Sequence, residues 1–165
     1  IAAVLDFVAG RLRVYLQGDD SSAHIIEAVL AEQNTNPFRA AKAVGELALW
    51  HNHRDWAHIL DSFARCVRIT RDKPAYSLNP AIMTDPAEVA LFQAYEAAAA
   101  RLGPDDNVGA MLAAFETMIP AITRFFDEVL VMDEDPAVRE NRLGLLQAIA
   151  ALAQGRGDFS QLQGF

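Results

Sequence analysis

The segment FFDEVLVMDEDPAVRENRLGLLQ, residues 125–147, joins an apolar run, an acidic turn and a stretch with several arginines. The Asp-Pro pair at 135–136 has the pattern of a helix start, because aspartate caps a helix well and proline suits its first turn. In the helix that follows, Arg142 falls in an apolar row with Leu145. An arginine in such a row usually pairs with a carboxylate or extends its charged end to solvent.

We interpret the polar residues of this segment as a structural joint that ties two helix ends together. Arg142 is expected to be at least partly buried and to pair with Asp127 or Asp133, while acids at a helix start interact well with the helix dipole. The joint comprises Asp127, Asp133, Asp135, Arg139, Asn141 and Arg142. The alternative is a two-metal site built from the acids Asp127, Glu128, Asp133, Glu134 and Asp135.

Helical periodicity extends over almost the whole chain, which predicts an all-α fold, a single bundle of about six to eight helices without a sheet. The exception is the loop of residues 70–86, where three prolines prevent a continuous helix, and this loop is expected to lie against the bundle. Helices are expected over residues 2–17, a short stretch after a cap at Ser21 or Ser22, 38–50, 54–69, 86–101, from 106 onward with a break at Pro120, and 135–154. Residues 158–165 are expected to form a tail.

Composition narrows the class of protein. The chain has 165 residues, 52% of them hydrophobic and 22% charged, which suits one ordinary globular domain over residues 1–165. The formal charge of −8 argues against nonspecific binding of nucleic acid but allows a local basic patch. The single Cys66 excludes an internal disulfide and favours a reducing compartment such as the cytoplasm. The first residue is not Met, so the chain is expected to be part of a longer protein.

The segment WHNHRDWAH, residues 50–58, concentrates three histidines. Metal ligands on a helix need a spacing of four residues, whereas His51, His53 and His58 are two and five apart. We therefore expect no metal here and interpret the segment as a helix end that Trp50 and Trp56 anchor in the core. The alternative is a metal-dependent phosphohydrolase that uses these histidines and nearby acids.

The segment FARCVRITRDK, residues 63–73, is basic and leads into the proline-rich loop. Basic groups beside an aromatic side chain suit single-stranded RNA, whose phosphates bind cations and whose unstacked bases need stacking partners. The candidate RNA-binding residues are Arg65, Arg68, Arg71, Lys73 and Tyr76, with Arg11 and Arg13 as a second source of phosphate contacts. A solvated basic face would have the same sequence pattern. No catalytic residue is expected.

The C-terminal third carries a long ordered motif. It reads P-x-x-x-FFD-x-V-x-V-M, then an acid-rich turn, then R-x-NRL-x-LL and a final D-x-S-x-L. The matching positions are Pro120, Phe125, Phe126, Asp127, Val129, Val131, Met132, Arg139, Asn141, Arg142, Leu143, Leu145, Leu146, Asp158, Ser160 and Leu162. This pattern closely resembles the C-terminus of the β subunit of bacterial tetrameric glycyl-tRNA synthetase, and FVAGRLRVYL and IIEAVLA resemble two earlier helices of that family. Arg68 stands where the family commonly has Asn, which leaves contacts at that position open.

The resemblance implies an all-α anticodon-binding domain of the DALR type, a function in gripping tRNA(Gly), and no bond-making chemistry or cofactor within this chain. It implies that ATP and magnesium serve the catalytic α subunit. The implied partners are tRNA(Gly), the rest of the β subunit and the α subunit in a heterotetramer. Binding to a membrane or to DNA is not expected. Glycine tRNAs share cytosines at the second and third anticodon positions, so the reader of that anticodon needs groups that recognise cytosine edges. A domain that only contacts another subunit is the remaining alternative.

Overall fold

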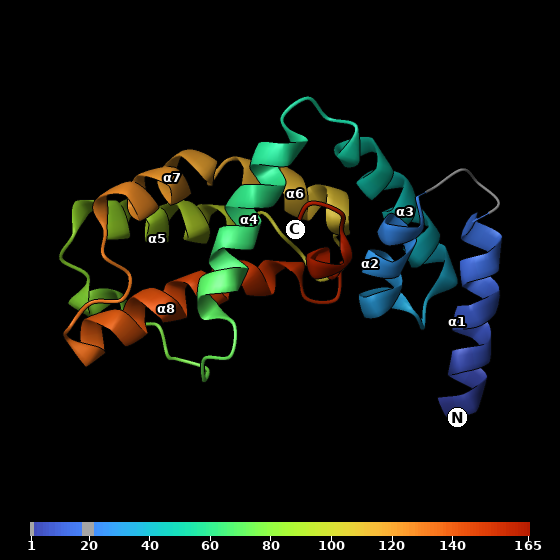
Figure 1. Ribbon diagram of the computed structural model, residues 1–165, viewed down its shortest axis with the longest axis horizontal. Helices are drawn as coiled ribbons and strands as arrows, with labels where there is room; N and C mark the ends of the chain where they lie inside the picture. The colour runs from blue at the N-terminus through green and yellow to red at the C-terminus, as the bar shows by residue number, and fades with distance from the viewer. Residues whose placement is uncertain (1, 18–21) are drawn as a thin grey trace. The chain divides into compact units, whose positions relative to one another are not determined.

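The computed structural model describes residues 2–17 and 22–165 and is all-α, as predicted, because these residues contain helices and no strand (Figure 1). The α-helices are α1 Ala2–Gln17, α2 Ala23–Gln33, α3 Pro37–His51, α4 Trp56–Thr70, α5 Pro86–Ala99, α6 Val108–Glu116, α7 Ile119–Glu128 and α8 Pro136–Ala150. Short 3-10 helices are η1 Pro80–Ile82, η2 Ala151–Ala153 and η3 Phe159–Gln161.

Three helices begin where an Asn-Pro or Asp-Pro pair predicts a start. The side chains of Asn36, Asp85 and Asp135 accept hydrogen bonds from backbone N–H groups in the first turns of α3, α5 and α8, at 2.8–3.0 Å. Each cap satisfies a donor that has no partner inside the helix. At α2 the cap position is Ser22, whose side chain makes no capping bond, and Ser21 lies outside the described residues.

The expected break near Pro120 separates α6 from α7, whose axes differ by 53°. Pro120 occupies the first turn of α7, where a missing N–H costs little. Among the described residues no single helix is long and apolar enough to cross a membrane, and only α6 and α7 taken together across the bend reach that length and composition.

The described residues pack as two compact units. The first unit takes its residues from 1–60, 105–112 and 153–165, and the second from 61–104 and 113–152, so that α4 and α6 contribute to both. The division does not follow the order of the sequence, and nothing in the sequence pattern predicted it. That residues 1–165 form one anticodon-binding domain stays a prediction.

In the first unit, α2 packs against α3, and α1 contacts both. Residues 158–165, expected to form a tail, instead dock on α2. The backbone N–H of Asp158 donates to the carbonyl of Ala28 at 2.7 Å, and the Phe159 ring is 2% exposed. The side chains of Phe159 and Leu162 therefore belong to the core of this unit.

In the second unit, α5 packs along α7 and also contacts α8 (Figure 1). Its core contains large, fully buried side chains from each of these helices, among them Leu91, Ile122, Phe125 and Leu143. The loop between α4 and α5 lies against α8 through hydrogen bonds, as the proline-rich sequence predicted. This unit contains both the joint and most of the candidate RNA-binding residues.

Candidate RNA-binding surface and its supporting joint

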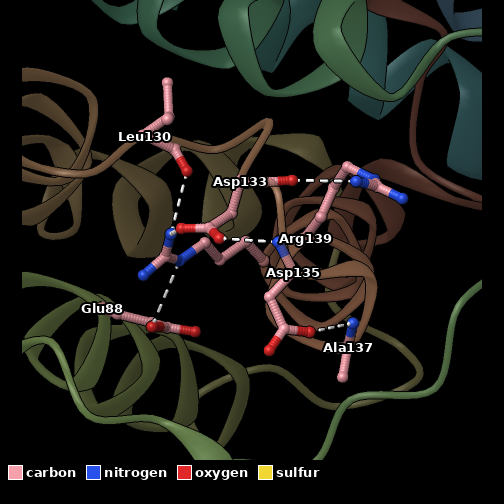
Figure 2. A network of polar contacts seen from close by, with 7 residues as sticks. Glu88, Leu130, Asp133, Asp135, Ala137 and Arg139 are labelled. Atoms are coloured by element: carbon pink, nitrogen blue, oxygen red, sulfur yellow. Dashed lines mark hydrogen bonds and ion pairs between the residues drawn. The ribbon is translucent and has the colours of Figure 1, made fainter.

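Arg142 is the centre of a buried polar network in the second unit. The residue is 7% exposed, and its Nη1 donates to the carbonyl of Leu130 and to Oδ2 of Asp133, both at 2.9 Å. Its Nε donates to Oε2 of Glu88 at 3.4 Å, a longer bond to a residue that is itself 2% exposed (Figure 2). The arginine thus connects α8 with α5 and with the turn before α8.

The two carboxylates around this arginine are perturbed in opposite directions. Burial raises the pKa of Glu88, because a charged group is disfavoured away from water, and the nearby Arg142 partly opposes that rise. The pKa of Asp133 is lowered by the backbone N–H of Asp135 and by Arg142, which both stabilise its charged form. Glu88 is therefore the member of the network that depends most on a compensating cation.

The other residues of the expected joint divide into two groups. Nη1 of Arg139 donates to the carbonyl of Asp133 at 2.8 Å, and the carboxylate of Asp135 caps α8 (Figure 2). Asp127, by contrast, is exposed on α7 and forms no ion pair within the part of the chain that the structure describes. Asp133 is thus the partner of Arg142, and the inclusion of Asp127 in the joint needs correction.

Sequence reasoning missed Glu88, which lies 54 residues before Arg142. Its only local signal is an acid in the first turn after an Asp-Pro helix start, where a favourable interaction with the helix dipole already explains it. A pairing across that separation depends on how α5 packs beside α8, which periodicity alone does not determine.

A second set of α8 side chains holds the loop that precedes α5. Oε1 of Gln147 accepts from the N–H of Tyr76 at 2.9 Å, and its Nε2 donates to the carbonyl of Pro74 at 2.8 Å. Oδ1 of Asn141 accepts from the N–H of Asn79 at 2.7 Å. Asn141 was expected in the joint, and its Oδ1 holds this loop. Gln147 was not singled out, and the backbone partners of both residues could not be predicted from the sequence.

The basic residues around the end of α4 belong to the second unit. Arg65 is half-buried, with its guanidinium 4.3 Å from the centre of the Phe126 ring, a distance typical of a cation–π contact. Arg68 is exposed, and its Nη1 lies 3.7 Å from Oδ1 of Asp61. Arg71 and Lys73 are exposed in the turn after α4. These four residues, Arg65, Arg68, Arg71 and Lys73, are called the basic cluster below.

The turn that carries Arg71 and Lys73 has a defined backbone. Asp72 has a φ of 59°, the left-handed conformation that aspartate tolerates better than most residues. The N–H of Lys73 donates to the carbonyl of Thr70 at 3.2 Å and closes the turn on the end of α4. Tyr76 is half-buried, so it contributes less exposed ring surface than a free stacking platform would.

Arg11 and Arg13 belong to the first unit. Nε and Nη2 of Arg13 donate to the two carboxylate oxygens of Glu27, the second bond at 2.9 Å, and this hydrogen bonding raises the pKa of Arg13. Arg11 is exposed and lies 5.5 Å from the ring centre of Phe7. A phosphate at Arg13 would have to compete with Glu27, so Arg11 is the more available cation of the two.

The histidine segment is engaged with aromatic rings. The His51 ring lies 5.1 Å from that of His24 and 5.8 Å from that of Trp56, while the His53 ring lies 5.4 Å from that of Trp50. Trp56 is buried and Trp50 half-buried, consistent with an anchored helix end. Over residues 2–17 and 22–165 no group of three His, Cys, Asp or Glu side chains could hold a metal ion.

Comparison with known proteins shows what the sequence of the chain is similar to. The chain is 35% identical over 167 residues to the "Glycine--tRNA ligase beta subunit" of Desulforudis audaxviator, covering 97% of this chain and 24% of the relative. The chain is homologous to a segment of the glycine–tRNA ligase β subunit. The same description applies to relatives from Anaeromyxobacter dehalogenans strain 2CP-C, 36% identical, and Geotalea daltonii, 33% identical, which the chain matches over 97% and 98% of its own length.

The chain spans about a quarter of the length of these curated relatives, 24% in each case. No protein-family model matches it. The homology therefore relates the whole of this chain to one part of a glycine–tRNA ligase β subunit, and the acid–arginine joint and the basic cluster both lie within that part.

Proposed function

We propose that this chain is a tRNA-binding segment of a glycine–tRNA ligase β subunit and that it recognises the anticodon of tRNA(Gly). The observation that supports this most directly is homology over nearly the full chain to proteins whose name includes tRNA. Attachment of glycine, with ATP and magnesium, is assigned to the catalytic α subunit. This segment would contribute affinity and specificity and no bond-making step.

The basic cluster supports the proposal because it concentrates positive charge on an acidic chain. Residues 61–73 contain the four cations of the cluster and only two acids, Asp61 and Asp72, whereas the formal net charge of the whole chain is −8. Exposed cations that neutralise phosphates release counterions, so log K falls with log salt by about 0.7–0.9 for each phosphate contacted. The exposed part of the half-buried Tyr76 ring supplies a limited surface on which an unpaired base could stack.

The test measures binding of a tRNA(Gly) transcript to the chain carrying Arg68→Ala and Arg71→Ala together. We expect weaker binding and a salt slope that is smaller by about one to two units, since each lost phosphate contact removes about one. Arg101→Ala is the matched control, because Arg101 is an exposed cation of the same unit outside the cluster. Wild-type affinity with an unchanged salt slope in the double variant would place RNA binding elsewhere.

Anticodon recognition needs a separate measurement. Transcripts in which the two anticodon cytosines are replaced should bind the wild-type chain more weakly than the native transcript. This discrimination should shrink in the Arg68→Ala, Arg71→Ala variant. Equal binding of both transcripts by the wild-type chain would contradict anticodon recognition while leaving general tRNA binding in place.

A second candidate function, contact with another subunit of the ligase, is favoured by an apolar groove in the first unit. The groove has a volume of about 450 Å³ and lies between α1 and α3, lined by Val8, Arg11, Leu12, Tyr15, Pro37, Phe38 and Ala41. Phe38 is 84% exposed and Tyr15 71% exposed. Exposed aromatic residues of this kind are enriched at protein interfaces. Phe38→Ser should weaken association with the α subunit if the groove serves that contact, and unchanged association would exclude it.

A further inference from the structure

The loop that carries the end of the basic cluster is extended but not free. Residues 73–79 form no helix, and loops of this kind are usually mobile and variable in conformation. Here the backbone of the loop is attached to α8 at three points, through Pro74, Tyr76 and Asn79. All three attachments are made by side chains of α8 that point to the loop and none by the loop's own side chains.

Gln147 binds the loop as a neighbouring strand would. Its amide accepts from the N–H of Tyr76 and donates to the carbonyl of Pro74, at 2.9 and 2.8 Å. The two backbone groups lie two residues apart, on the same side of an extended segment. One side chain therefore satisfies two backbone groups and fixes the direction of the chain between them.

Gly144 allows the loop to come this close. A Cβ added at Gly144 would lie 3.3 Å from the carbonyl oxygen of Tyr76, tighter than most contacts of a Cβ, and 3.4 Å from that of Ser77, so the loop would have to shift by a few tenths of an ångström. Asn141, Gly144 and Gln147 follow one another at intervals of three residues, so they are neighbours on the helix surface. We call Asn141, Gly144 and Gln147 the loop-holding row.

Lys73 lies between two fixed points of the backbone. Its own N–H is bonded to the carbonyl of Thr70, and the carbonyl of the next residue, Pro74, is bonded to Gln147. Asp72, with its φ of 59°, sets the chain reversal between Thr70 and Lys73. The direction in which Lys73 leaves the backbone thus depends on α8, although no residue of the loop-holding row belongs to the basic cluster.

We propose that Asn141, Gly144 and Gln147 are positioning residues for RNA binding, which hold residues 74–79 in place and thereby orient Lys73 toward the phosphates. This inference rests on the proposed function of the basic cluster. A loop that is already ordered does not lose conformational freedom when RNA binds, so the loop-holding row raises affinity without touching the ligand.

The experiment compares Gln147→Leu with Gln93→Leu, the same chemical change at an exposed position of α5. Binding of the tRNA(Gly) transcript is measured together with thermal unfolding and with hydrogen exchange of the Tyr76 and Asn79 amides. We expect Gln147→Leu to expose the Tyr76 amide to exchange and to weaken binding by about tenfold, with most of the protein still folded at the assay temperature. Gln93→Leu should change neither quantity.

A merely structural role would lower the unfolding temperature and leave the affinity of the folded protein unchanged, which would overturn the proposal. The decisive arm combines Gln147→Leu with Lys73→Ala. If Gln147 acts through Lys73, the effect of Gln147→Leu on affinity should largely disappear in the Lys73→Ala background, because the group being oriented is gone. Full additivity of the two effects would also overturn the proposal.

Gly144→Ala provides an independent variant, since it moves the loop backbone without removing a hydrogen-bonding group. It should weaken RNA binding in the same way as Gln147→Leu. The variants also distinguish RNA binding by the basic cluster from positioning by the loop-holding row. If Lys73→Ala and Arg71→Ala leave binding unchanged, the proposed function of the basic cluster fails. If they weaken binding while Gln147→Leu and Gly144→Ala do not, only the positioning role fails.

Discussion

Replacing Arg142 with methionine should destabilise the second unit strongly, because it leaves Glu88 buried without its cation. Methionine preserves most of the length and apolar volume of the side chain, so the change is mainly the loss of charge and of three hydrogen bonds. Breaking a buried ion pair from one side costs about 3–5 kcal/mol. For a chain of this size that loss lowers the unfolding temperature by about 6–20 °C.

Arg139→Met is the matched control on the same helix. Arg139 is half-buried and makes a single bond to the carbonyl of Asp133, so its loss should cost about 1 kcal/mol. Urea and thermal unfolding followed by circular dichroism measure both variants. A cost below about 1 kcal/mol for Arg142→Met, or one no larger than that of Arg139→Met, would refute the buried joint.

The pH dependence of the same variant tests the role of Glu88. Burial raises the pKa of this carboxyl in the folded state, so the folded state binds its proton more tightly than the unfolded state does. Its contribution to stability is then fully present below the unfolded pKa, about 4.3 for an ordinary glutamate, and is lost as pH rises through the folded pKa. Without Arg142 the folded pKa should rise further, because the opposing cation is gone.

The cost of Arg142→Met should therefore be larger near neutral pH than at mildly acidic pH, where a protonated Glu88 needs no cation. The double variant Arg142→Met, Glu88→Gln should recover part of the loss at neutral pH, since the buried charge is removed from both sides. A loss that is independent of pH, together with no recovery in the double variant, would show that Glu88 is not the group left uncompensated.

Two further predictions concern single residues of the second unit. Cys66 is fully buried, and burial raises the pKa of its thiol to about 12. Iodoacetamide at mildly alkaline pH should therefore not alkylate the native protein but should label it completely in urea. Labelling of the native chain would contradict this burial. Asp72→Asn should keep the left-handed turn, which asparagine also tolerates. It should strengthen binding of a tRNA(Gly) transcript roughly twofold to fivefold, because repulsion between a carboxylate and a nearby phosphate costs up to about 1 kcal/mol in water. Unchanged or weaker binding would show that this turn is not part of the RNA surface.

The helix positions could be predicted because their signals are local. A cap and a proline lie within two residues of each other at Asn36, Asp85 and Asp135, and the backbone responds to them directly. The pairing of Arg142 with an acid in the turn before α8 was accessible for the same reason, since Asp133 is only nine residues away. The involvement of Glu88 and the docking of the C-terminal residues on α2 were not accessible, because they depend on packing between distant segments.

The apolar row that contains Arg142 also shows a limit of helical periodicity, which does not predict burial where a helix is covered on all sides. A surface helix has one buried face, and the row that contains Arg142 and Leu145 is expected to be that face. In the structure every residue from 141 to 146 is buried, so α8 has no solvent face over this stretch. Asn141 Oδ1 and the Arg142 guanidinium bind partners there, which is how polar residues can stand beside three leucines in a buried stretch without following a simple period.

Because α8 is buried on all sides over this stretch, its side chains bind different neighbours, and mutations on different sides should have different effects. Arg142 binds α5 and the turn before α8, whereas Gln147 and Asn141 bind the backbone of the loop after α4. Loss of the first set leaves a buried charge uncompensated, and loss of the second leaves backbone groups that water can reach and satisfy. Arg142→Met should therefore lower stability while the folded fraction still binds RNA with normal affinity, and Gln147→Leu should lower affinity with a small effect on stability. The most distinctive segment of the sequence would then act on RNA only indirectly, through a loop that it holds in place.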